Sequence, residues 1–196
     1  MKFSLSAVLF LFLIITSCKD VKQQRIAENE KDTKKKEIIF SNINKGWVFN
    51  SQPINSTAQS LNGTWAEWGV FLKELSQKPK SSIGAFQQKA KTLSKKVADL
   101  NNNIPITFDK PGIKSRVAVL TTKINSLTLY INLDKIPDEK VVALVGEINV
   151  ELFSLQSQMD EIVRKNTIPK EEGESDLIQM LDTTRAIPTN KKVPNL

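Results

Sequence analysis

Carboxylate side chains in the second half of the sequence are the residues most able to hold a metal ion. Glu147 and Glu151 are four residues apart, and Asp160 and Glu161 follow. Helical bundles that hold two iron ions combine inward-facing glutamates with Glu-x-x-His motifs. The sequence has no histidine, and Glu147 lies outside the predicted core series, on the outer side of its helix. We therefore expect a solvated acidic face here, with no metal and no cofactor.

The scarcity of histidine and cysteine excludes several classes of active site. Without histidine there is no Ser-His-Asp triad, no histidine general base and no histidine-ligated zinc or haem. The single cysteine excludes an intrachain disulfide, a cysteine-rich zinc site and an iron–sulfur cluster held by this chain alone. No motif for carboxylate or lysine catalysis is visible, so we expect a protein that is not an enzyme.

The single cysteine, Cys18, is the residue with the clearest predicted chemistry. It follows a positively charged start and the apolar run LSAVLFLFLII over residues 5–15, which is short for a transmembrane helix and typical of a secretory signal. Ile15-Thr16-Ser17-Cys18 resembles the bacterial lipobox. The sequence thus predicts a signal peptide over residues 1–17 and a lipid on Cys18 that anchors the protein in a membrane. Lys19-Asp20 partly matches a surface-export signal of Bacteroidota.

The residues after Cys18 are expected to connect this anchor to a folded domain. Residues 18–37 are rich in charge and poor in apolar side chains, which predicts a disordered tether. Residues 38–53 contain two short apolar patches, IIF and WVF, separated by asparagines and a glycine. We expect them to form an extended arm that packs against the domain.

The folded domain is predicted over residues 54–167 from apolar residues that recur every three or four positions in four segments. This spacing is typical of amphipathic helices, since strands would require a spacing of two. The series are Ala58, Leu61, Trp65, Trp68, Leu72 and Leu75; Ile83, Phe86, Ala90, Leu93, Val97 and Leu100; Ile113, Val117, Leu120, Ile124, Leu127 and Ile131; and Val141, Val145, Ile148, Leu152, Leu155, Met159 and Ile162.

Residues at the ends of the four segments support the same boundaries. Ser56-x-x-Gln59 reads as a capping box, and Ser81 or Ser82 is suited to cap the second helix. Short links within the first and second pairs of segments make neighbouring helices antiparallel. We predict an all-α fold, an antiparallel up-down-up-down four-helix bundle. Residues 168–187 should add a short helix capped by Ser175, and residues 188–196 a disordered tail.

Aromatic residues offer two interpretations. Trp65 and Trp68 fall at core positions, where packing is the usual role, although they are also suited to wall a cavity for a small apolar ligand. The candidate contacts for a protein partner are Trp47, which lies in the arm, and Phe71 and Phe153, which lie outside the core series.

Lysines in the second segment form a candidate anion-binding patch. Lys89, Lys91, Lys95 and Lys96 lie in a stretch with no acidic residue before Asp99, in a chain of 28 basic and 21 acidic residues. Such a patch suits an anionic glycolipid or polysaccharide, whereas nucleic acid is not an expected partner for an exported lipoprotein. The alternative is a lysine face that only confers solubility.

Three stretches resemble small lipoproteins of unknown function from flavobacteria and related bacteria. They are TWAEWGVFLKELSQKPKSSIGAFQ over Thr64–Gln87, NLDKIPDEKVVALVGEIN over Asn132–Asn149, and LDTTRAIPT over Leu181–Thr189. The resemblance implies an envelope location and one helical domain, and it carries over no functional residue.

Together these observations predict a non-catalytic, membrane-anchored interaction module of the cell envelope. Its partner would be another envelope protein, and its location the outer membrane, facing either the periplasm or the cell surface. The alternative is a ligand-binding bundle, with an apolar molecule in the core or an anionic polymer on the lysine face.

Overall fold

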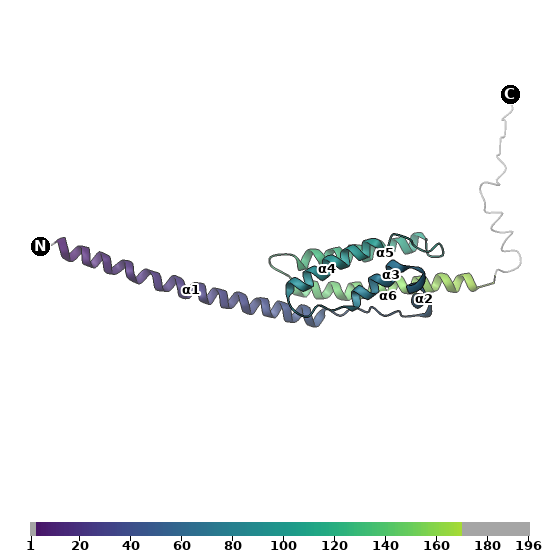
Figure 1. Cartoon of the computed structure of the whole chain (residues 1–196), viewed down its shortest axis with the longest axis horizontal. Helices are drawn as coiled ribbons and strands as arrows, with labels where there is room; N and C mark the ends of the chain where they lie inside the picture. Colours follow the sequence, from purple (N-terminus) through teal and green to yellow (C-terminus); the bar gives the residue numbers. More distant parts are fainter. Residues whose placement is uncertain (1–2, 170–196) are drawn as a thin grey trace, which may run out of the picture.

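The computed structural model describes residues 3–169, with side chains from residue 22 onward except that of residue 62. Within these residues the chain is entirely helical apart from loops, which confirms the all-α prediction (Figure 1). The helices are α1 (Phe3–Gly46), α2 (Ser56–Thr64), α3 (Ala66–Ser76), α4 (Ile83–Asp99), α5 (Pro111–Ile131) and α6 (Asp138–Thr167). The predicted short helix after Ser175 and the predicted tail lie outside the described residues.

The prediction of a disordered tether and an extended arm is wrong in part, because α1 continues through the whole tether and the first part of the arm, to Gly46. Residues 22–37 are rich in lysine, glutamate and glutamine, which are good helix formers. The last turns of α1 pack on the domain through Ile43, which is buried, and through Ile39 and Phe40. These tertiary contacts offset the cost of starting a helix, and the helix then extends outward from them. Only residues 47–53 of the predicted arm lie outside a helix.

The first predicted helix is divided into α2 and α3 at Trp65. The backbone of Trp65 leaves the helical region, at φ −124° and ψ 86°, just after Gly63 and Thr64, which are poor helix formers. The predicted capping box at Ser56 is also wrong, because the side chain of Asn55 accepts a hydrogen bond from Ala58 N at 2.7 Å. At α4, the expected cap is confirmed at Ser82, whose Oγ accepts from Ala85 N at 3.2 Å.

The four predicted apolar series form the core. Every member is buried except Ile83 and Ile162, which pack partly buried against the others. Helix α5 lies between α4 and α6, α3 packs against α4, and both α2 and the end of α1 pack against α6 (Figure 1). Thr128 Oγ1 donates to Ala90 O at 3.0 Å and joins α5 to α4. None of the helices in the described part of the chain has an apolar stretch long enough to cross a membrane.

Candidate functional site

Cys18 lies in α1, in the part of the helix whose side chains are not described. From residue 22 to residue 38 every side chain is exposed, and contact with the domain begins at Ile39. We call residues 18–38 the stalk. At 1.5 Å per residue it spans roughly 30 Å, and Figure 1 shows it projecting away from the other helices.

Two of the three aromatic candidates for partner contact are buried, so this part of the prediction is wrong. Trp47 is 2% exposed, with its ring edge-on to Phe86 at 5.1 Å, because the last turn of α1 places it over the core. Phe71 is fully buried, 6.2 Å from the ring of Trp68, because the apolar stripe of α3 is wider than its main series. Phe153 is 60% exposed and remains a candidate.

The rings of Trp65 and Trp68 stack on each other at 5.9 Å, and both are fully buried. They therefore fill the space that a ligand between them would need, which favours the packing interpretation. Among the residues that the structure describes, their indole N–H groups, like that of Trp47, have no hydrogen-bond acceptor. Burial of these donors is a cost that the surrounding apolar packing must offset.

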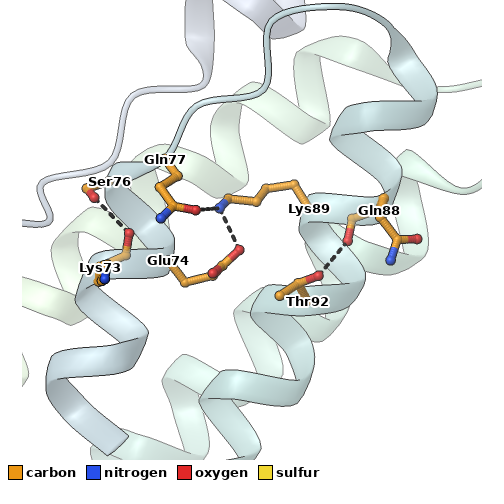
Figure 2. A network of polar contacts seen from close by, with 7 residues as sticks. All are labelled: Lys73, Glu74, Ser76, Gln77, Gln88, Lys89 and Thr92. Carbon is orange, nitrogen blue, oxygen red and sulfur yellow. Dashed lines mark hydrogen bonds and ion pairs between the residues drawn. The ribbon is translucent and has the colours of Figure 1, made fainter. Parts of the chain in front are cut away.

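The four candidate lysines do not form one cationic face. Figure 2 shows Lys89 Nζ bonded to Glu74 Oε1 at 2.6 Å and to Gln77 Oε1 at 3.3 Å, with the lysine only 9% exposed. Lys96 lies on the same side of α4, and its Nζ is 3.7 Å from Asp99 Oδ2.

The other two lysines, Lys91 and Lys95, point away from this side of α4, since each residue turns the helix by about 100°. Both are exposed. Lys89 therefore joins α4 to α3 through an ion pair with Glu74. The sequence did not reveal this because Glu74 and Gln77 lie in a different predicted segment.

Residues 47–55, which we call the strap, are held along α6 by two amide side chains. Asn149 Nδ2 donates to Val48 O at 2.9 Å, and Asn149 Oδ1 accepts from Asn50 N at 2.8 Å. One heptad further on, Gln156 Oε1 accepts from Ile54 N at 3.0 Å. The sequence did not predict this arrangement. The available signal was the seven-residue spacing of Asn149 and Gln156 beside the core series.

The side of α6 opposite the core carries a second series of residues with three- and four-residue spacing, which we call the outer face. Its largest side chains, Val150 and Phe153, are 64% and 60% exposed. Ala143 and Gly146 are also exposed, and within the described part of the chain no side chain beyond the adjacent residues and no other helix lies within 4 Å of a Cβ built on Gly146. The outer face comprises Ala143, Gly146, Val150, Phe153 and Ser157.

A groove of about 610 Å³ continues the outer face toward the stalk. It lies between the end of α1 and the start of α6, where Asn42 Nδ2 donates to Asp138 Oδ2 at 2.6 Å. Gly46 permits this close approach of the two helices, because a Cβ there would lie 2.5 Å from the side chain of Val142. The groove is lined by Asn42, Lys45, Gly46, Asp138, Glu139, Val142 and Ala143.

Two carboxylates of α6, Glu147 and Glu161, form ion pairs. Glu147 Oε2 lies 2.5 Å from Lys123 Nζ, and this hydrogen bond raises the pKa of Lys123. Glu161 Oε1 accepts from Lys165 Nζ at 2.8 Å, which lowers the pKa of Glu161. In the part of the chain that the structure describes, no three metal-ligating side chains gather in one place.

Comparison with known proteins identifies no relative: no family model, no curated protein and no solved structure matches this chain. The functional interpretation therefore rests on the geometry of the chain itself. The two features of that geometry that point outward are the stalk and the outer face.

Proposed function

We propose that this protein is a non-catalytic interaction module of the cell envelope, anchored by a lipid on Cys18, whose outer face binds another envelope protein. The observation that carries the proposal is the exposure of Val150 and Phe153 on the side of α6 opposite the core. Large apolar side chains that share one exposed helix face are characteristic of protein-binding surfaces.

The stalk supports the anchoring part of the proposal. Its side chains from residue 22 to residue 38 are exposed, so the helix holds the domain away from Cys18 without packing against it. A lipid there would place the domain roughly 30 Å from the membrane. The proposed location is the outer membrane, facing the periplasm or the cell surface, with the signal peptide of residues 1–17 removed.

The contacts between helices support a four-helix, up-down-up-down bundle in which α2 and α3 together make the first helix. Along α5 and α6, Lys123 meets Glu147 and Arg116 meets Ser154, so residue numbers rise on one helix as they fall on the other. Helices α4 and α5 are antiparallel as well, because Ala90 is hydrogen-bonded to Thr128 and Ser94 to Asn125. Such a bundle would be a rigid support for the outer face.

The chemistry of the outer face suits a protein partner. Its side chains between Ala143 and Ser157 carry no charge, so binding an apolar surface there desolvates no ion. An exposed Phe ring that is covered on binding contributes about 25 cal/mol per Å² of apolar area removed from water. A central aromatic side chain of this kind is a typical hot spot.

The test is capture of the tagged full-length protein from crosslinked, detergent-solubilised envelopes. We expect one reproducible partner with the wild type, loss of that partner with Phe153→Asp, and retention with Leu129→Asp. Leu129 is the matched control, because it is 61% exposed on α5 and lies away from the outer face. Cys18→Ala should also lose the partner because the protein is no longer anchored. Equal capture by Phe153→Asp and the wild type would contradict the proposal.

A further inference from the structure

We infer that the outer face of α6 is covered by the chain's own residues 170–186, which fold back antiparallel along α6. This docking is a property of the isolated chain. Its consequence, that the segment competes with the envelope partner, rests on the proposed function.

The path of the chain at the end of α6 makes this fold-back accessible. Helix α6 ends at Thr167, and Ile168 already has extended backbone angles, with φ −71° and ψ 122°. Pro169 follows, and proline neither continues a helix nor allows the residue before it to remain helical. The chain therefore leaves the helical path at the end of α6, the helix on which the rest of residues 3–169 leaves Val150 and Phe153 exposed.

The lengths of the two segments match. Residues 170–174 contain Gly173 and span roughly 17 Å if extended, at about 3.3 Å per residue. That distance equals about eleven residues of helix, so Ser175 can come level with Gln158. If a helix starts at Ser175 and runs back along α6, Leu181 comes level with Leu152, the residue next to Phe153.

The side chains of the segment fit the outer face. Leu177, Ile178 and Leu181 follow the spacing of one apolar helix face, with Ser175 as the predicted N-cap. An amphipathic helix laid on an apolar surface is a common mode of recognition. The outer face offers Phe153 as a large contact.

The charges on the two segments also favour an antiparallel fold-back along α6. The acidic residues Glu171, Glu172 and Glu174 follow the last turn of α6, which carries the exposed bases Arg164 and Lys165. Folding back brings these opposite charges together. The covalent link also keeps the segment at millimolar effective concentration, well above that of a second copy or of a separate partner.

Hydrogen exchange of the full-length chain with Cys18→Ser tests the docking. We expect amides of residues 177–185 to exchange at least about ten-fold more slowly than in an unstructured chain. Phe153→Asp should abolish this protection, and the equally exposed control Leu129→Asp should preserve it. Both sites are on the surface, so each variant should remain folded. Unprotected amides in the wild type, or protection that survives Phe153→Asp, would overturn the inference.

A crosslinking experiment identifies the occupant. In the Cys18→Ser chain, Val150→Cys with Leu181→Cys should be joined within one chain by a short thiol-specific crosslinker, whereas Leu129→Cys with Leu181→Cys should not. A crosslinked dimer as the main product would instead assign the outer face to a second copy. These results do not depend on an envelope partner. A docked segment with no captured partner would sustain this inference while contradicting the proposed function.

If both proposals hold, a chain that ends after Pro169 should capture more of the envelope partner than the full-length chain. Equal capture by the two chains would show that the segment and the partner do not compete for the outer face.

Discussion

The inner and outer faces of α6 have the same spacing of residues but opposite surroundings. The inner series includes Ile148 and Leu152, which are fully buried against the other helices. The outer series includes Val150 and Phe153, which lie two places and one place away from them in the sequence and are mostly exposed. The comparison shows that helical spacing identifies a face that can be buried, whereas the neighbouring helices decide which face is buried.

The largest expected difference between the two faces is in the cost of truncating an aliphatic side chain. Leu152→Ala should lower the free energy of unfolding by about 2–5 kcal/mol, because it leaves a cavity among packed helices. Val150→Ala should change it by no more than about 1 kcal/mol, because the helices of residues 3–169 leave that side chain 64% exposed. Urea unfolding followed by circular dichroism measures both. Similar losses for the two variants would remove the distinction between the faces.

Alanine substitutions at two glycines compare the packing on the flank of α6 with the packing on its outer face. Gly46→Ala should destabilise the protein by about 1–3 kcal/mol, because the new Cβ would lie 2.5 Å from Val142. Gly146→Ala is the matched control and should stabilise α6 by up to about 1 kcal/mol, because its Cβ would enter open space. Thermal unfolding of both variants checks the prediction, which is wrong if their midpoints shift in the same direction.

The strap on the flank of α6 should contribute less. Asn149→Ala removes two hydrogen bonds to the strap, those with Val48 O and Asn50 N, and should cost about 1–2 kcal/mol. Hydrogen exchange at Asn50 should become faster. Asn101→Ala is the control, because that side chain bonds only within its own turn, to Ala98 O. Unchanged exchange at Asn50 would indicate that the strap is held by its apolar side chains alone.

The smallest expected effect concerns Glu161, on the outer side of α6 beyond Ser157. Its hydrogen bond with Lys165 lowers its pKa below the usual 4.5. Because the folded-state pKa is lowered, the pair stabilises the fold above pH 4.5, and this stabilisation is lost as the pH falls through the lowered value. Lys165→Ala should raise the pKa of Glu161 toward 4.5 in an NMR titration. A pKa unaffected by Lys165→Ala would assign the shift to another neighbour.

Much of the helical domain could be predicted from sequence because amphipathic spacing is a local property. The series from Ile113 to Ile131 and the series from Val141 to Ile162 were predicted, and every member proved to be buried except Ile162, which is partly buried. The cap at Ser82 was predictable for the same reason, because its partner is three residues away. The candidate site was predicted only in part: Phe153 was identified as a contact residue, but Trp47 and Phe71 were not recognised as buried.

The sequence alone determined where amphipathic helices form, which residues make up their apolar series, and that the chain has no histidine and a single cysteine, Cys18. The tertiary structure decided that α1 extends to Gly46, that Lys89 pairs with Glu74, and that the strap lies along α6. Each of these features depends on contacts between residues in different predicted segments. Local spacing contains no information about such contacts, because burial and pairing depend on which helices become neighbours in the folded chain.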